Sequence, residues 1–300
     1  MAVQAVQKKI KTAINRQRWL DRLSDPLQTA TQTVYQNSGV LGQKIQDFLN
    51  GTWLGHPLHP VITDVTVGAL TAAVVLDGLD VASGEDTFAP GADAALMLGV
   101  TSAVGAAAAG LTDWQHTQGE ARRIGMLHAG LNGASLVLYL LSLGFRKNRQ
   151  RGAGQGLALA GYLFSVAAAY LGGDLVYRQK IGVNHSRQEP ITRDFTPVLS
   201  SAELAEGQMV KAKWKSTKIL LARINGEVLA MNDTCAHMGG PLSEGELCAD
   251  GSVICPWHQS RFDLRTGSVI NGPSAFPQPR YEAREHNGMI EIRQPAEINQ

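Results

Sequence analysis

Four long apolar segments in the middle of the chain constrain its fold more than any other feature. They span roughly residues 60–82, 91–113, 124–145 and 153–177, and each is about long enough to cross a bilayer as a helix. Turn-forming and charged residues separate them, and the segments are rich in Ala and Gly. Small residues let helices approach closely in lipid. The sequence therefore predicts an all-α four-helix transmembrane bundle over residues 51–177.

A soluble, alanine-rich four-helix bundle is the alternative for these segments. Asp64 and Asp77 lie within the first segment and favour this alternative, because ionisable groups are costly in a bilayer. Trp114 and Tyr177 favour the membrane, because they lie near predicted helix ends, where aromatic side chains often mark the interface. We expect the membrane domain.

The N-terminal residues 1–50 are predicted to form a basic amphipathic helical segment. Apolar residues recur at helical spacing over residues 2–23, while Lys and Arg lie mostly off that stripe. Pro26 is expected to end this helix or to begin the next one. No apolar stretch of the signal-peptide kind follows the basic residues, so we expect no cleaved leader. The segment either lies on an anionic lipid surface or packs on its own membrane domain.

A pattern of cysteine and histidine near the C-terminus predicts a metal centre. The sequence Cys235-Ala-His237 is followed, after seventeen residues, by Cys255-Pro-Trp-His258. Two thiolates and two imidazoles suit a cluster in which the cysteines hold one iron and the histidines the other. A Cys2His2 zinc site is the alternative, although zinc fingers use another ligand order and spacing. Small residues after His237, including Gly240 and Pro241, allow two loops to close over a cluster.

These motifs resemble the Rieske iron–sulfur family, over roughly the last hundred residues. The resemblance implies a 2Fe–2S cluster of the Rieske type, with Cys235, His237, Cys255 and His258 as its metal ligands. It also implies a small all-β antiparallel domain, which we place at residues 194–296 after a polar linker at 178–193. Two Asn-Gly pairs between apolar runs, at 225–226 and 287–288, independently predict β-hairpins.

The residues around the ligands resemble Rieske-type ferredoxins more than the Rieske proteins of cytochrome bc complexes. The latter carry an extra disulfide at the positions of Gly240 and Trp257, which cannot form here. Ser260 keeps a hydroxyl that hydrogen-bonds to the cluster in that family, whereas Phe262 replaces a tyrosine. Gln259 stands where the family usually has Gly, and we expect it to distort the loop. The resemblance places Ser260, Gly240, Pro241 and Phe262 beside the cofactor.

The apolar region resembles a second family, an uncharacterised four-helix membrane domain often fused to Rieske domains. The resemblance rests on Gly55-His-Pro-Leu-His-Pro60 before the first segment, and on motifs that begin at Gly110 and Arg122. It implies the fold of residues 50–177 and adds little about function.

The sequence also predicts a second site in the membrane domain. Its histidines fall at one predicted end of the bundle, and imidazoles from facing helices are how bundles hold haem or metal. His59 and His128 are the pair we expect to bind a cofactor. Haem b, a quinone and a metal ion are the candidates. In the alternative without a cofactor, these imidazoles cap helix ends or bind Asp side chains or lipid headgroups.

The favoured function is a membrane-anchored Rieske protein that carries single electrons, exchanging them with a cofactor in the membrane domain. The alternatives are a ferredoxin-type donor to a separate oxygenase and a redox sensor without turnover. An electron-transfer protein is favoured over an enzyme, because only about forty residues follow His258, too few for an oxygenase domain. The net charge of +1 gives no reason to expect nucleic acid as a partner. The expected partners are the lipid bilayer and a redox protein that the sequence does not identify.

The expected location is the inner cell membrane, with both termini and the Rieske domain in the cytoplasm. An even number of spans puts both termini on one side, and six basic residues flank the spans there against four on the other side. The three cysteines leave Cys248 without a partner for a disulfide once two are ligands, which suits a reducing compartment. We expect Cys248 to be an ordinary, partly buried residue.

Overall fold

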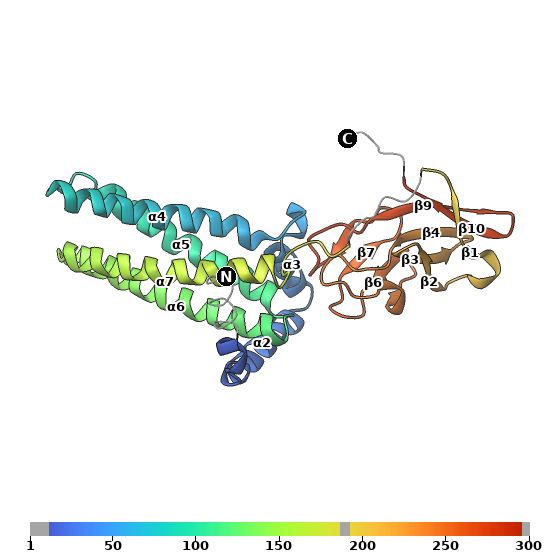
Figure 1. The fold of residues 1–300 in the computed structure, drawn as a ribbon, viewed down its shortest axis with the longest axis horizontal. Helices are drawn as coiled ribbons and strands as arrows, with labels where there is room; N and C mark the ends of the chain where they lie inside the picture. The colour runs from blue at the N-terminus through green and yellow to red at the C-terminus, as the bar shows by residue number, and fades with distance from the viewer. Residues whose placement is uncertain (1–11, 187–192, 296–300) are drawn as a thin grey trace. The chain divides into compact units, whose positions relative to one another are not determined.

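The protein is described from a computed structural model, which defines residues 12–186 and 193–295. Contacts divide the chain into two compact units. Unit 1 comprises Met1–Gly42 and Pro57–Ile181, and unit 2 comprises Gln43–His56 and Gly182–Gln300. Each unit is described by itself below, and Figure 1 follows the chain through both by colour.

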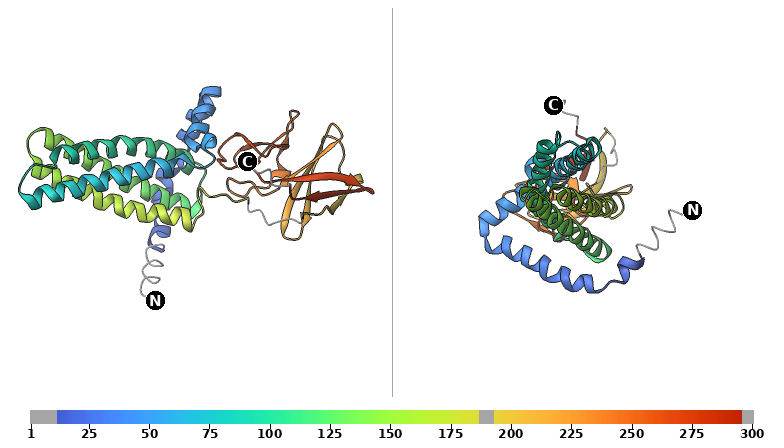
Figure 2. Two further views of the ribbon diagram at one scale, coloured as in Figure 1. Left: turned by 90° about the horizontal axis from the view of Figure 1, so that it is seen from above. Right: turned by 90° about the vertical axis from the view of Figure 1, so that its left-hand side faces the viewer.

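Four long helices form the main part of unit 1 and confirm the predicted bundle. They are α4 (Leu58–Ser83), α5 (Ala89–Trp114), α6 (Gly119–Lys147) and α7 (Arg151–Tyr177). By length and composition, all four are able to cross a membrane. They run side by side in Figure 1 and in both views of Figure 2. Polar or glycine-containing turns at the predicted breaks separate them, so that neighbours in sequence run antiparallel.

Close contacts at small residues hold the helices together. The most extensive packing joins α4 to α5 and α6 to α7, and α5 also contacts α6 as α4 contacts α7. A Cβ atom at Gly99 of α5 would lie 2.5 Å from the Leu70 side chain of α4. One at Gly161 of α7 would lie 2.9 Å from the Tyr139 ring of α6. Glycine is therefore what lets these large side chains fill the interior of the bundle.

Helix α2 (Trp19–Asn37) packs on the bundle, which is one of the two placements left open for the N-terminal segment. Asp21 accepts hydrogen bonds from Arg122, at 2.9 Å, and from Arg123, at 2.7 Å. The buried amide of Gln28 donates to the carbonyl oxygens of Trp114 and Thr117, both at 3.0 Å. The end-on view in Figure 2 shows α2 following the periphery of the bundle. Residues 2–11 of the predicted amphipathic helix lie outside the described residues.

The prediction that Pro26 ends one helix or begins the next was wrong. Pro26 lies inside α2, and the helical conformation is interrupted instead at Gln17 and Arg18. Proline removes the hydrogen bond to the carbonyl four residues earlier. That carbonyl belongs to Arg22, which is exposed, so solvent is available to it. The contacts of Asp21 and Gln28 on either side of Pro26 compensate for the lost bond.

A network of buried charges links all four long helices at the end of the bundle where α4 and α6 end. The guanidinium of Arg146 is 3% exposed and lies 2.9 Å from Asp77 and 2.7 Å from Asp93. Arg151 donates to Asp93 at 3.0 Å and to Asp80 at 3.1 Å. Asp77, which favoured a soluble bundle in the sequence, is thus neutralised by arginine. A buried carboxylate with such partners is compatible with a membrane helix.

We predict that Arg146→Ala destabilises unit 1 by about 3 kcal/mol, because the buried carboxylate of Asp77 then keeps only its longer ion pair with Arg151, at 3.3 Å. The measurement is the thermal unfolding midpoint of the detergent-solubilised protein. The neighbouring exposed Lys147 provides the control, since Lys147→Ala removes an equal charge outside the network. Equal midpoints for the two variants would show that the network contributes nothing to stability.

Unit 2 contains two antiparallel sheets, as the sequence predicts. Six strands have the order β1-β10-β9-β4-β3-β2, and four short strands have the order β5-β6-β7-β8. In chain order the strands are β1 (Thr196–Ser200), β2 (Met209–Trp214), β3 (Thr217–Ile224), β4 (Glu227–Asn232), β5 (Glu246–Leu247), β6 (Ser252–Ile254), β7 (Arg261–Asp263), β8 (Val269–Asn271), β9 (Arg280–His286) and β10 (Met289–Arg293). Helix α3 (Gly39–Asn50) reaches from unit 1 into this unit.

Both predicted hairpins are present. Strands β3 and β4 meet with Ile224 opposite Glu227, and Asn225 and Gly226 between them have φ values of 53° and 77°. Two successive positive φ values are those of a type I′ turn, whose twist matches the flanking strands. The turn between β9 and β10 has the same geometry, at 50° and 75°. These hairpins build the large sheet, against which the small sheet packs through a shared apolar core.

Candidate metal centre

Two loops of the same backbone geometry present the two cysteines. The amide of Cys235 donates to the carbonyl of Gly240 at 2.8 Å, and the amide of Gly239 donates back to Cys235 at 2.9 Å. In the second loop Cys255 donates to the carbonyl five residues later at 2.8 Å, and the amide four residues later donates back at 3.1 Å. Each cysteine therefore begins a tight loop with its N–H and C=O both satisfied. The side chain is left to point at the centre between the loops.

The fourth residue after each cysteine has a positive φ, which corrects the expectation for Gln259. The φ values are 81° at Gly239 and 63° at Gln259. This is the left-handed region, which favours glycine and costs other residues roughly 1–2 kcal/mol. The glycine usual at position 259 of the family thus has a conformational reason. Gln259 adopts the conformation of that glycine, and the loop keeps the hydrogen bonds of its counterpart.

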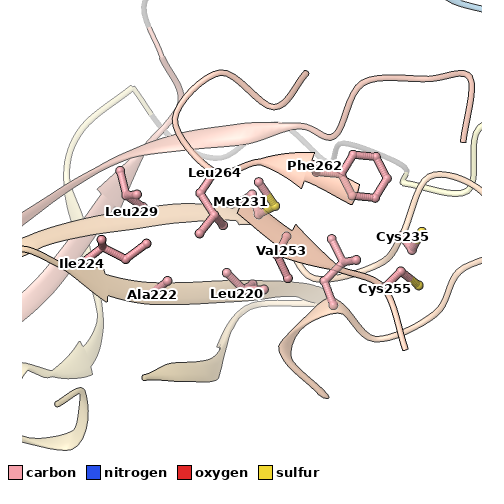
Figure 3. Packing of buried hydrophobic residues seen from close by; sticks show 11 residues of the cluster. Leu220, Ala222, Ile224, Leu229, Met231, Cys235, Val253, Cys255, Phe262 and Leu264 are labelled. Atoms are coloured by element: carbon pink, nitrogen blue, oxygen red, sulfur yellow. The ribbon is translucent and has the colours of Figure 1, made fainter. Parts of the chain in front are cut away.

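The two thiols lie together at one end of the core of unit 2. Cys235 is 1% exposed and Cys255 is 2% exposed, and both belong to the core cluster that contains Phe262. Figure 3 shows the two sulfur atoms close to one another, at the end of the cluster away from Leu229 and Ile224. The two thiols therefore lie close enough together to bind one iron.

Hydrogen bonds to the thiols shift their pKa values in opposite directions. The thiol–thiol hydrogen bond, together with burial, raises the pKa of Cys235. The same bond lowers the pKa of Cys255. In both loops, the backbone N–H groups two and three residues after the cysteine donate to its sulfur. Such donors favour the thiolate, the form that binds metal, and stabilise negative charge on sulfur.

The two imidazoles lie beside each other, with their ring centroids 5.0 Å apart and their planes at 86°. Burial lowers the pKa of His258, which keeps its imidazole neutral, as a metal ligand must be. A 2Fe–2S cluster takes two ligands at each of two irons, and the site supplies one pair of thiols and one pair of imidazoles. The donor set therefore fits the two-iron cluster.

Gly240 and Trp257 lie next to each other across the two loops. A Cβ atom at Gly240 would lie 3.0 Å from the sulfur of Cys255 and 3.0 Å from the Trp257 ring. The pair thus occupies the place that the resemblance assigns to a disulfide in other Rieske proteins. Here the indole, 57% exposed, covers this edge of the site instead. Pro241 follows, and its neighbour Leu242 is fully buried below the loop.

Ser260 and Phe262 differ in what they offer the cluster. The buried hydroxyl of Ser260 accepts a hydrogen bond from the amide of Ser274 at 3.0 Å, which leaves its own hydrogen available to donate. Phe262 is fully buried in the core cluster that contains both cysteines, and it offers only an apolar ring there. One hydroxyl donor is therefore kept at the site and another is missing.

Sequence reasoning missed the residues that hold these loops from outside. The buried side chain of Gln278 accepts from the amide of Ala236 at 3.0 Å and donates to the carbonyls of Asn232 and Thr234, both at 2.7 Å. The amide of His185 donates to the carbonyl of Ala236 at 3.0 Å. No local motif marks either residue, because each acts through backbone groups distant in sequence.

A third loop, after β8, is held by a residue from the N-terminal part of the chain. Asp47 of α3 accepts from the amide of Gly272 at 2.7 Å and from the side chain of Asn271 at 3.2 Å. A Cβ atom at Gly272 would lie 2.9 Å from the Asn50 side chain. The adjoining Ser274 bonds to Ser260, so α3 contacts the loop that closes over the centre. A contact across more than two hundred residues leaves no signal in a single sequence.

In unit 1, the structure brings His59 of α4 and His128 of α6 together. Their ring centroids are 6.5 Å apart and their planes are at 81°. The Nδ1 atom of His59 donates to the carbonyl of Ala106 at 2.8 Å, and that of His128 donates to Ala168 at 2.8 Å. The predicted pair therefore lies within one site.

Comparisons with known proteins agree with both halves of this description. The family model of the Rieske [2Fe-2S] domain matches residues 194–282, and that of a "predicted membrane protein (DUF2231)" matches residues 55–185. The 3-phenylpropionate/cinnamic acid dioxygenase ferredoxin subunit of Escherichia coli (strain K12) is 35% identical over 94 residues, which are 31% of this chain and 88% of that protein. Apoptosis-inducing factor 3 of Mus musculus is 33% identical over 91 residues, 30% of this chain and 15% of that protein.

Among solved structures, the ferredoxin of carbazole 1,9a-dioxygenase from Nocardioides aromaticivorans IC177 matches 33% of this chain and 97% of its own, with 24% identity and a TM-score of 0.32. The matched loops, sheets and donor set define an iron–sulfur protein of the Rieske family, with a 2Fe–2S cluster. The chain belongs to that family, and in it the Rieske domain follows a DUF2231 membrane domain.

We predict a midpoint potential in the lower half of the Rieske range of about −150 to +300 mV. Phe262→Tyr should raise it by about 20–60 mV, since one added hydrogen bond of about 0.5–1.5 kcal/mol to a cysteinyl sulfur favours the reduced cluster. The measurement is a potentiometric titration monitored by EPR. Phe195→Tyr, on a ring that stacks on Arg284 and Arg293, is the matched control and should leave the potential unchanged. A wild-type midpoint above roughly +250 mV would contradict the account of Phe262.

Proposed function

We propose that this protein is a membrane-anchored carrier of single electrons, in which the 2Fe–2S cluster of unit 2 takes up and releases one electron at a time. Cys235 and Cys255 hold one iron, and His237 and His258 hold the other. The bound cluster supplies the redox chemistry. The paired loops with N–H donors aimed at both sulfurs are the observation that carries this proposal.

The residues around the cluster set its environment rather than make or break bonds. Ser260 donates a hydrogen bond toward the cluster, and Gly240 gives Cys255 and Trp257 room. Pro241 and Phe262 shield the cluster with apolar surface. The protein then acts as an electron-transfer component of an oxidoreductase system, and its likeness to a ferredoxin subunit supports this role. The second electron site, in the membrane domain, is the subject of the next subsection.

The four helices of residues 51–177 anchor the protein in the bilayer. Large apolar side chains are exposed along all four, including Val75 at 55%, Leu98 at 53%, Leu140 at 53% and Leu163 at 62%. Helix α2 likewise exposes Trp19, Leu23 and Leu27 at successive turns of one face. In water so much exposed apolar surface would drive association, whereas lipid covers it. We place the protein in the inner cell membrane.

A ferredoxin-type donor to a separate oxygenase is the second candidate function. The likeness of residues in the Rieske domain to the ferredoxin subunit of a dioxygenase favours it. In that case the redox partner is an oxygenase component, and the membrane domain serves as an anchor. A redox sensor, in which the state of the cluster alters an interface without turnover, is the third.

The experiment that tests the carrier is a redox cycle on the purified protein. Dithionite should add one electron per 2Fe–2S cluster and give an EPR signal with an average g below 2, and ferricyanide should reverse this reduction over repeated cycles. Cys255→Ser should abolish the signal. Cys248→Ser, on a half-buried cysteine outside the site, is the control and should leave it intact. Stoichiometric zinc without iron, or a cluster lost on each reduction, would contradict the proposal.

We further propose that both termini and the Rieske domain are cytoplasmic, on the basis of the basic residues that flank the spans. Reporter fusions at the C-terminus test this topology. A reporter active only in the cytoplasm should give signal, and its counterpart active only outside the cytoplasm should give none. The reverse pattern would invert the topology and remove the reason to expect a reduced Cys248.

A further inference from the structure

His59 and His128 come from helices at opposite corners of the bundle. Helix α4 packs on α5 and α7, and α6 packs on the same two helices, so α4 and α6 lie across the interior from each other. Their imidazoles nevertheless lie only 6.5 Å apart between ring centroids. Both side chains therefore reach into the space that the four helices enclose.

The two histidines make the same contacts, each with its own neighbouring helix. His59 donates from Nδ1 to the carbonyl of Ala106 on α5, and one turn later Gly110 faces its ring, where a Cβ atom would lie 2.9 Å from it. His128 donates from Nδ1 to the carbonyl of Ala168 on α7. Gly172 follows four residues after Ala168, and a Cβ atom at that position would lie 3.2 Å from the His128 ring. An alanine in place of either glycine would crowd the imidazole.

These hydrogen bonds fix the tautomer of each ring. A carbonyl oxygen only accepts, so Nδ1 carries the proton in both residues and Nε2 keeps its lone pair. The side-chain amide of Asn132 donates to Nε2 of His128 at 3.1 Å, which agrees with this assignment. Donation of one ring nitrogen to a carbonyl while the other is free to bind is the arrangement of metal-ligating histidines.

The separation suits two ligands on opposite sides of a single metal ion. With both Nε2 atoms about 2.0 Å from a metal, the ring centroids would lie about 6–6.5 Å apart. Among the described residues, no group of three His, Cys, Asp or Glu could complete a protein-only site. The remaining ligands must come from the cofactor, and a porphyrin supplies four nitrogens in the plane between two axial imidazoles.

The other two helices carry only small residues beside the two imidazoles. Helices α5 and α7, which carry neither histidine, present small residues around Ala106, Gly110, Ala168 and Gly172. On α6, the side-chain amide of Asn132, an exposed residue, lies beside the His128 ring. A polar amide exposed at this depth of an apolar helix is costly in lipid and suits a ligand site.

We propose that His59 and His128 are the axial ligands of a non-covalently bound haem in the membrane domain. All three cysteines of the chain lie at positions 235, 248 and 255, so this domain has no thiol for a covalent thioether link. Asn132 turns away from Nε2 of His128 when the iron binds there. A quinone fits these two imidazoles less well. Its carbonyl oxygens accept hydrogen bonds, and neither Nε2 atom carries a proton to donate.

This inference deepens the proposed function and rests on it for the electron that reaches the haem. The reduced cluster gives up one electron, so that one of its irons passes from Fe(II) to Fe(III), and the haem iron passes from Fe(III) to Fe(II). No bond forms or breaks, and no proton moves. The membrane domain is then a second redox site rather than an anchor alone.

The test is to purify the full chain from a host supplied with 5-aminolevulinate and to determine haem by the pyridine haemochrome assay. We expect one non-covalent haem b per chain. Its optical spectrum should be that of a haem iron with two axial nitrogen ligands. His59→Ala and His128→Ala should each lower the haem content at least tenfold. Added imidazole should restore haem to the purified variants, because it fills the space that the deleted ring leaves. His116→Ala, in the connection after α5, is the matched control and should keep haem.

The EPR signal of the cluster is recorded on every sample, which separates this inference from the proposed function. Its persistence in both alanine variants shows that they fold and that the cluster is independent of the haem. A wild-type protein that holds the cluster but no haem, also after titration with haemin, overturns the proposal. Haem that both variants retain, or an extracted quinone with no haem, overturns it as well.

Discussion

The backbone geometry shared by the two cysteine loops is the constraint on which the rest of unit 2 depends. Each loop closes on its own cysteine, with one residue in the left-handed conformation, and each turns two N–H groups toward its sulfur. Backbone donors are fixed in place at no cost in side-chain entropy, so they stabilise negative charge at the sulfurs without reorganisation. The sheets and Gln278 hold these loops in position, and Asp47 holds the loop after β8 that lies next to them. A substitution that changes this loop geometry would therefore disturb the site, whereas Gln259 preserves the geometry.

Most of the architecture could be predicted from the sequence, because its signals are local or periodic. Apolar length predicts the four helices to within a few residues of their ends, and the Asn-Gly pairs predict the two type I′ turns. The break near Pro26 was misplaced, because tertiary contacts on both sides keep α2 helical. Gln278 and Asp47 could not be found, since their partners lie tens to hundreds of residues away. Gln259 was misjudged because residue type alone does not reveal that a strained conformation is accepted.

The four-helix unit combines two polar features that an anchor alone does not need. At one end, Arg146 and Arg151 form ion pairs with three aspartates from α4 and α5, which link the helices. Nearer the other end, His59 and His128 each donate to a backbone carbonyl and pack on a glycine of the adjacent helix. The α4–α5 pair and the α6–α7 pair repeat this arrangement. Charges in the first set satisfy one another. The second set keeps two nitrogens with lone pairs, and that difference is why we assign structure to one and ligand binding to the other.

The central claim is that the donor set of this chain, two thiolates and two imidazoles, holds two irons in unlike environments. A Mössbauer spectrum of the purified protein enriched in ⁵⁷Fe tests it most directly, because the isomer shift of iron reports whether sulfur or nitrogen binds it. The account predicts two inequivalent cluster sites in equal amounts, with the added electron on the histidine-ligated iron after reduction. Two equivalent sites with sulfur ligands only, or a single isolated iron, would contradict it.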